Sequence, residues 1–230
     1  MIDWNKIENF IGYGNPDAEV LFLGMEEGLG QSADLGGDLA ERSRYSQCMD
    51  LFDAQGPLDD GQRFFGPNPK SQRTWRPMCH LMLRMLAPSS RPTAEQRVRY
   101  QADLLGRSGG ATLLAELMPY PNTNVGEWRY APFGRYPTRE AYAVEMLPRR
   151  VDLLGTFFRA HNYKLIVAYG KSYWPDFQRI FVGVSWEDRG IFRVGRFGST
   201  AVVLTPHFAT RSFNTEAQLD AFADIALGVP

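Results

Sequence analysis

The stretch EVLFLGMEEG, residues 19–28, places a short apolar run directly before a glycine and two adjacent glutamates. Similar apolar runs recur along the chain and alternate with longer stretches that have helical periodicity. This alternation favours a parallel sheet that is covered by helices on both faces. Four runs are expected to form the strands of that sheet: residues 19–23, 112–118, 165–169 and 200–205.

The remaining elements are predicted from periodicity and from turn residues. Residues 191–197 are expected to pair with the last strand across Gly198 and Ser199, which form a plausible hairpin turn. Either Asn214 or Thr215, with Gln218 following, is typical of a helix start. Helices are expected over residues 74–86, 94–105, 138–160, 172–181 and 215–227.

Residues 53–68 are rich in glycine and proline and are expected to form a loop rather than a domain boundary. The sequence has no internal repeat and no linker that would divide it. We therefore expect one three-layer α/β domain spanning residues 1–230, with a central, mainly parallel sheet of four strands.

The composition is ordinary for a globular protein, with 230 residues, 44% apolar and 22% charged. No stretch approaches the roughly 20 unbroken apolar residues of a membrane helix, and the first residues lack the layout of a signal peptide. We expect a soluble, cytoplasmic protein that is monomeric and has no membrane partner. Cys48 and Cys79 are too few for a disulfide framework or a four-thiolate metal site, so neither a metal nor a cofactor is expected.

The net charge of −1 conceals a gradient along the chain. Residues 1–60 carry 3 basic and 13 acidic side chains, whereas residues 61–150 carry 14 basic and 6 acidic ones. Arginine, whose planar guanidinium suits phosphate recognition, supplies 21 of the 25 cations. The gradient fits either solvated helix faces or a nucleic-acid surface. On the second interpretation the arginines of that surface are Arg63, Arg73, Arg76, Arg129 and Arg211.

Ligands of an open parallel sheet bind beyond the carboxyl ends of its strands, so the residues after each run are candidates for a site. Glu26 and Glu27 are expected in a glycine-rich turn after the first strand, although the glycine spacing is not that of a dinucleotide fingerprint. Glu116 lies at the end of the second strand, before a proline turn. His207 follows the last strand directly after a proline, which directs it towards the same edge.

These motifs, in this order, resemble the uracil-DNA glycosylase superfamily. Residues 24–28 (GMEEG) resemble the family's first motif, and residues 205–209 (TPHFA) resemble its second. Residues 63–66 (RFFG) are similar to the segment whose phenylalanine stacks on an extruded base, and residues 116–122 to the strand and proline turn that read the edge of that base. Residues 165–170 are similar to the family's third strand.

The resemblance covers about residues 17–211 but departs from the family at several functional positions. Glu26 stands where the family has Asp or Asn, and Glu27 stands where it usually has Pro. Phe208 and Ala209 replace Pro and Ser, and Glu116 falls where uracil readers commonly have Asn. The cysteines of the iron–sulfur branch are absent. The expected fold tolerates these differences, whereas uracil specificity is not implied.

The resemblance implies that the protein binds an extruded base and cleaves its N-glycosidic bond. Glu26 would position water and stabilise the cationic sugar, and His207 would contact the oxyanion of the leaving base. Phe64 would stack on the base, with Phe65 as the substitute if the alignment is off by one residue. The residues that would bind the base are Gly24, Met25, Phe64, Glu116 and Asn122.

Other interpretations remain open. The partner is DNA or another nucleic acid, or a free nucleobase bound by a module that cleaves nothing. A different hydrolase would use Glu26 and Glu27 for metal-assisted chemistry. Glu116 could also face a helix or an arginine. If it reads a base while ionised it only accepts hydrogen bonds and suits an amino-bearing or modified base, whereas a protonated Glu116 could also donate.

Overall fold

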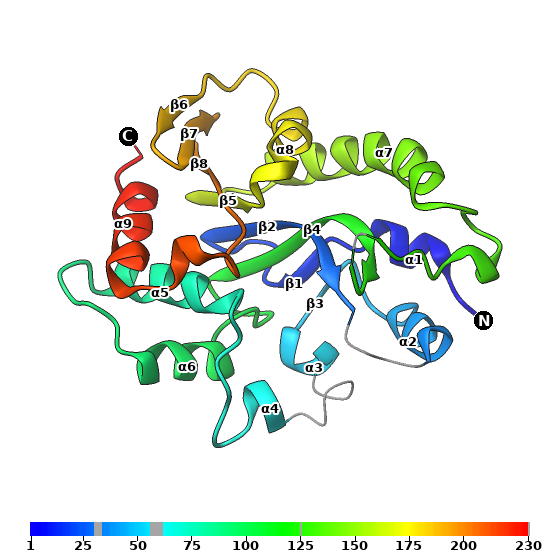
Figure 1. Ribbon diagram of the computed structural model, residues 1–230, viewed down its shortest axis with the longest axis horizontal. Coiled ribbons are helices and arrows are strands. Elements are labelled where there is room, and N and C mark those ends of the chain that lie inside the picture. The colour runs from blue at the N-terminus through cyan, green and yellow to red at the C-terminus, as the bar shows by residue number, and fades with distance from the viewer. Residues whose placement is uncertain (30–33, 56–61, 125, 230) are drawn as a thin grey trace.

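The computed structural model describes residues 1–29, 34–55, 62–124 and 126–229. In these residues the strands form one mixed eight-stranded sheet in the order β3-β1-β4-β2-β5-β8-β7-β6 (Figure 1). The fold class is therefore α/β, as expected, but the sheet is larger than the four strands predicted. The strands are β1 (Gly12–Gly14), β2 (Val20–Gly28), β3 (Cys48–Met49), β4 (Thr112–Asn122), β5 (Leu165–Tyr169), β6 (Glu187–Arg189), β7 (Phe192–Phe197) and β8 (Thr200–Thr205).

The centre of the sheet consists of the four predicted strands, which pair in parallel in the order β4-β2-β5-β8. The expected hairpin is also present, because β7 pairs antiparallel with β8 from Phe197 opposite Thr200, and Gly198 turns the chain with a φ of 62°. Short strands extend the sheet at both edges. The prediction omitted β1, β3 and β6 because strands of two or three residues carry too little alternation to be recognised.

Strand β2 is longer than predicted, and this corrects the expected glycine-rich turn. The strand continues through Glu26 and Glu27 to Gly28, pairing Glu26 with Met118 and Gly28 with Asn122 of β4. The register shifts in this last part. Pro119 and Pro121 of β4 have no N–H to donate to a ladder, which accounts for the irregular pairing. The two glutamates therefore lie on a strand, whose alternation directs neighbouring side chains to different faces.

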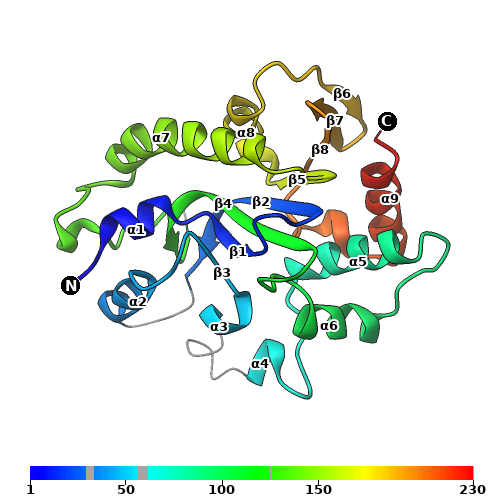
Figure 2. The same ribbon diagram turned by 180° about the vertical axis from the view of Figure 1, so that it is seen from behind.

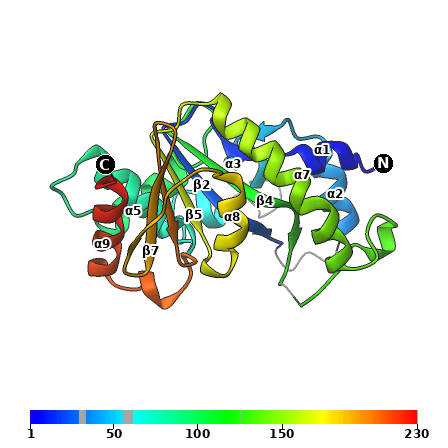
Figure 3. The same cartoon turned by 90° about the horizontal axis from the view of Figure 1, so that it is seen from above.

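Helices cover both faces of the sheet, with α7 and α8 on one face and α5, α6 and α9 on the other (Figures 1, 2 and 3). The five predicted helices are all present, and the expected start at Thr215 forms a capping box with Gln218. The helices are α1 (Trp4–Asn9), α2 (Leu35–Arg42), α3 (Leu51–Gln55), α4 (Gln62–Phe65), α5 (Trp75–Leu86), α6 (Ala94–Asp103), α7 (Arg139–Ala160), α8 (Trp174–Ile180) and α9 (Glu216–Leu227).

The loop expected over residues 53–68 is only partly correct. Helix α3 ends within this stretch at Gln55, and residues 62–65 form α4. Residues 56–61 lie outside the described residues. In the parts of the chain that the structure describes, no helix is long and apolar enough to cross a membrane.

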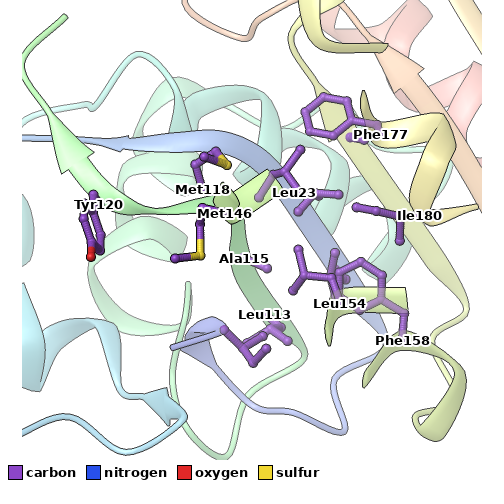
Figure 4. Close-up of a cluster of buried hydrophobic side chains, with 14 of the residues drawn as sticks. Leu23, Leu113, Ala115, Met118, Tyr120, Met146, Leu154, Phe158, Phe177 and Ile180 are labelled. Carbon is purple, nitrogen blue, oxygen red and sulfur yellow. The ribbon is translucent and has the colours of Figure 1, made fainter. Parts of the chain in front are cut away.

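The alternation of β2 separates two hydrophobic cores. Leu21 and Leu23 point into the core that α7 and α8 cover, where Met146, Leu154 and Phe177 pack against the sheet (Figure 4). Val20 and Phe22 belong to the opposite core, beneath α5 and α9. Because β5 and β4 alternate in the same way, Tyr169 at the end of β5 and Glu116 in the middle of β4 lie on the face of α5 and α9. The sequence had placed Glu116 at the end of its strand, but β4 continues to Asn122.

Candidate functional site

Gly24, Glu116 and Tyr169 meet where β5 ends, about halfway along the longer strands β2 and β4. Gly24 of β2 pairs with Glu116 of β4 in the register of the sheet. The Tyr169 hydroxyl, at the end of β5, donates to Oε1 of Glu116 at 3.1 Å. A Cβ atom at Gly24 would lie 2.1 Å from Oε2 of Glu116 and 2.5 Å from the Tyr169 hydroxyl. Only glycine therefore leaves room for this pair.

The Glu116 carboxyl group is held in a poorly solvated position. Its second oxygen, Oε2, is buried and has no hydrogen-bond partner among the described residues. Burial, together with the negative charge of Glu27, raises the pKa of Glu116 to about 8, although the Tyr169 hydroxyl acts in the opposite direction. Glu116 is therefore protonated at neutral pH and offers an O–H donor. This answers the question that the sequence left open about its charge.

A Glu116→Gln variant should change how stability depends on pH. In the unfolded chain this carboxyl ionises near pH 4.5, but in the folded protein it stays protonated up to about pH 8. The folded state thus binds the extra proton, and native stability falls as pH rises between these values. The Glu116→Gln variant lacks this titration. Since one pKa unit corresponds to about 1.4 kcal/mol, the difference in free energy of unfolding, variant minus native, should increase by a few kcal/mol from pH 5 to pH 9. Urea unfolding at both pH values measures this, and a constant difference would contradict the assigned pKa.

His207 follows β8 and lies beside the same group. Its ring centroid is 5.5 Å from that of Tyr169, and its Nδ1 accepts a hydrogen bond from the backbone N–H of Ala209 at 3.2 Å. The imidazole is exposed, yet partial desolvation lowers its pKa. A neutral His207 with Nδ1 acting as acceptor carries its proton on Nε2. The ring can therefore donate from Nε2, as the resemblance implied.

Glu26 is held in an ion pair that the sequence did not predict. Arg139, the first residue of α7, contacts both Glu26 oxygens at 2.5 and 3.3 Å, and the Glu26 side chain is only 9% exposed. Burial raises the pKa of Glu26, and Arg139 partly offsets this effect. A water-positioning role for Glu26 must therefore operate beside a guanidinium.

Glu27 has more hydrogen-bond partners within the protein than Glu26 has. Arg42 of α2 pairs with both of its oxygens at 2.8 and 2.9 Å, while Tyr13 and Gln55 each donate to it at 2.8 Å. Although burial opposes ionisation, Arg42 and the other donors lower the pKa of Glu27. Glu27 is therefore an ionised carboxylate whose oxygens are occupied by the protein. It raises the pKa of Glu116 more than Glu26 does.

The carboxylates do not form a metal-binding group in the described part of the chain. Those residues contain no cluster of three or more His, Cys, Asp or Glu side chains that could hold a metal ion. Glu26 and Glu27 each have an arginine as their main partner. This donor set does not suit the metal-assisted hydrolase that the sequence left open.

Two of the predicted base-binding residues, Asn122 and Met25, make contacts within the protein. Asn122 is buried, its amide nitrogen donates to the Glu127 carbonyl at 3.1 Å, and its Oδ1 accepts from the N–H of Thr123. The Asn122 side chain therefore closes the loop after β4. Met25 packs against the hydrophobic core beneath α7 and α8. Neither side chain is among the described contacts of Glu116.

Phe64 and Phe65 lie on α4 in an aromatic group with Trp75. The Phe64 ring is 5.5 Å from that of Trp75, and the Arg63 guanidinium lies over Phe64 at 4.9 Å. Phe65 contacts the rings of Phe52 and Trp75. These contacts, as far as the described residues show, do not join either phenylalanine to Glu116 or His207. A stacking role for Phe64 remains a prediction.

Two of the predicted nucleic-acid-binding arginines hold the segment that contains His207. Arg73 donates to the carbonyl of Ala209 at 3.1 Å, and Arg76 donates to that of Asn214 at 3.0 Å. Arg63 and Arg211 are exposed, and Arg129 is half-buried. Arg73 therefore contacts the backbone two residues after His207, and Arg76 contacts it seven residues after His207.

Part of the charge gradient in the sequence reflects ion pairs between segments. Asp50 pairs with Arg107 at 3.0 Å, Glu8 with Arg135 at 2.8 Å, and Glu26 with Arg139. Acidic residues before position 60 thus neutralise basic residues after position 100. The gradient by itself does not indicate a nucleic-acid surface.

Tyr169, Arg139 and Arg42 are the site residues that the sequence analysis missed. Tyr169 had a usable signal, because it ends a predicted strand at the same edge as Glu116. The two arginines come from distant helices and had none. No protein-family model and no curated protein matches this sequence, so the resemblance to the uracil-DNA glycosylase superfamily rests on the motifs alone.

Proposed function

We propose that the protein is a DNA glycosylase-like hydrolase that binds an extruded base and cleaves its N-glycosidic bond. The observation that carries this proposal is the meeting of Gly24, Glu116 and Tyr169 beside His207 at the end of β5. The parallel centre with helices on both faces agrees with a uracil-DNA glycosylase-like fold. DNA or another nucleic acid is the proposed partner.

The residues support the proposed chemistry as follows. Cleavage of the glycosidic bond leaves negative charge on the base and positive charge on the sugar. The protonated Glu116 and the Nε2–H of His207 are donors for the base. The Glu26 carboxylate, kept in place by Arg139, would stabilise the sugar cation and position the water that attacks it.

Oligonucleotides that each carry one altered base provide the test. Native protein should leave abasic sites on at least one of them, which alkali converts into strand breaks. His207→Ala should release the base more slowly, because the leaving base loses a donor. His161→Ala is the matched control, since His161 contacts the Phe157 carbonyl and Asp17 away from this site. Equal rates for the two variants would contradict the role of His207.

A non-catalytic binding module is the second candidate, and one observation favours it. Glu26 and Glu27 are both committed to arginine partners, so neither carboxylate is unpaired. Such a module would release no base from any oligonucleotide. It would still bind a free nucleobase or a nucleic-acid end, with an affinity that depends on Glu116.

A further inference from the structure

We propose that His80 is an acid-sensitive clamp: its neutral imidazole holds α9 against α5 and α6, and its protonation loosens α9 together with the segment before it, residues 207–214. The clamp consists of His80, its hydrogen-bond partners Arg97 and Asp220, and the ion pairs around them. It requires none of the chemistry proposed above, so it operates whatever ligand the protein binds.

His80 lies where three helices meet. It belongs to α5, and its side chain has no exposed surface. Its Nε2 is 3.0 Å from Oδ1 of Asp220 on α9, and its Nδ1 is 3.3 Å from a guanidinium nitrogen of Arg97 on α6. The three helices lie on the same face of the sheet (Figures 1 and 2). One imidazole ring therefore connects α5 with both of its neighbours.

Arg97 determines which nitrogen of the ring carries the proton. A guanidinium group only donates hydrogen bonds, so Nδ1 of His80 must be the acceptor of this pair. The single proton of the neutral ring then lies on Nε2, from which it is donated to Asp220. Protonation of Nδ1 would place two donors against each other. The neutral ring thus joins α6 to α9, whereas the charged ring loses its bond to α6.

The charges around the ring also oppose its protonation. Ionisable groups from α5, α6, α9 and the connection between α5 and α6 surround the ring and its partners. The cations are Arg76, Arg84, Arg91 and Arg97, and the anions are Glu216, Asp220 and Asp224. Each anion already pairs with an arginine, so a charged imidazole adds to an excess of cations. Burial lowers the pKa of His80, Arg97 lowers it further, and Asp220 offsets these effects only in part.

Acid should therefore weaken the docking of α9. A free imidazole takes up a proton near pH 6.5, whereas His80 in the folded protein does so only at lower pH. A form in which α9 has moved away binds the extra proton, so this form gains as the pH falls below 6.5. Burial opposes the ionisation of Asp220, but Arg91 and the other cations lower its pKa. His80 thus changes its charge in this range while Asp220 keeps its own.

The segment that leads into α9 carries His207. Phe222 of α9 packs against Phe208 and Phe213 of this segment, with ring centroids 5.4 and 5.5 Å apart. Phe208 directly follows His207 in the chain. Loosening of α9 therefore removes contacts that fix residues 207–214.

Hydrogen exchange of the full chain at pH 7.5 and pH 5.0 tests the clamp, with rates corrected for the intrinsic effect of pH. The protection of α9 amides should fall on acidification by up to about tenfold for each unit by which the folded pKa of His80 lies below that of a free imidazole. Helix α7, on the opposite face of the sheet, is the internal reference and should lose less protection. The readout is α9 rather than residues 207–214, because His207 titrates within that segment.

His80→Gln removes the titration while keeping an N–H that can donate to Asp220, so its α9 should show no more acid-dependent loss than α7. His161→Gln is the matched control, since His161 contacts the Phe157 carbonyl near the end of α7. It should retain the loss seen in the native protein. An equal acid-dependent loss in the native protein and in His80→Gln overturns the clamp.

¹⁵N NMR of the histidine rings decides the matter on native protein if His80→Gln does not fold. The chain has three histidines, so spectra of His161→Gln and His207→Ala identify the His80 signals by elimination. At pH 7.5 the His80 ring should be neutral with its proton on Nε2, and its midpoint should lie below 6.5. A charged ring at pH 7.5 overturns the clamp. So does an α9 that loses no more protection than α7 between pH 6.5 and this midpoint.

Discussion

Replacing Arg150 with methionine should lower the free energy of unfolding by about 3 to 5 kcal/mol, because each buried acceptor left without a partner costs about 1 to 3 kcal/mol. Arg150 lies on α7 and is only 1% exposed. Its guanidinium donates to the carbonyls of Leu117 at 2.9 Å, Glu8 at 3.1 Å and Glu116 at 2.8 Å. Methionine has a similar length but no donor, so it would leave three buried carbonyl groups without these partners.

The topology explains why an arginine is needed there. Strand β1 pairs with β4 only as far as Ala115, so the following carbonyls of β4 lack a neighbouring strand on that side. Arg150 takes the place of that strand. Burial lowers its pKa to about 10, which still leaves the side chain charged at neutral pH.

Urea unfolding of Arg150→Met and Arg149→Met measures the effect with a matched control. Arg149 is the adjacent residue, is 52% exposed and contacts Glu8 and Glu145 only at 3.6 Å. Its replacement should change the free energy of unfolding by less than about 1 kcal/mol, as exposed ion pairs usually do. Similar losses for the two variants would show that the three carbonyl contacts do not stabilise the fold.

The sequence predicted the centre of the sheet because each central strand is an apolar run with turn residues beside it. Such runs are buried on both faces, as in residues 165–169, and their pattern is local. Strand β1, which lies beside the edge strand β3, contains two glycines in three residues and has no such pattern. The extension of β2 was missed for a related reason, since Gly24 was taken as the start of a turn when its role is to make room for Glu116.

The candidate site was predictable only in part, because its electrostatics depend on residues that are far apart in the sequence. The strand ends identified Glu116 and His207 as neighbours of one edge, and the structure agrees through Tyr169. The partners of the two glutamates could not be inferred. Arg139 is 113 residues from Glu26, and no local pattern indicates that they pair.

On the proposed function, Glu26→Gln should reduce the rate of base release about 100-fold or more while changing ligand affinity little. Glutamine keeps the shape of the side chain but removes a charge that is felt chiefly in the transition state, where the sugar becomes cationic.

Replacing Arg139, the ion-pair partner of Glu26, gives a second prediction. Because burial raises the pKa of Glu26 and Arg139 opposes that effect, Arg139→Gln should shift the acidic limb of the pH–rate profile upward.

Single-turnover release from the best oligonucleotide substrate measures both variants. Glu19→Gln is the control, because Glu19 precedes the same strand, is 51% exposed and pairs with Lys164. Its rate should match that of the native protein. Binding of the same oligonucleotide by Glu26→Gln shows whether the loss lies in the chemical step. If Glu26→Gln and native protein release a base equally fast, the Glu26–Arg139 pair only anchors α7 to β2, and the carboxylate that stabilises the sugar must be sought elsewhere at the edge of the sheet.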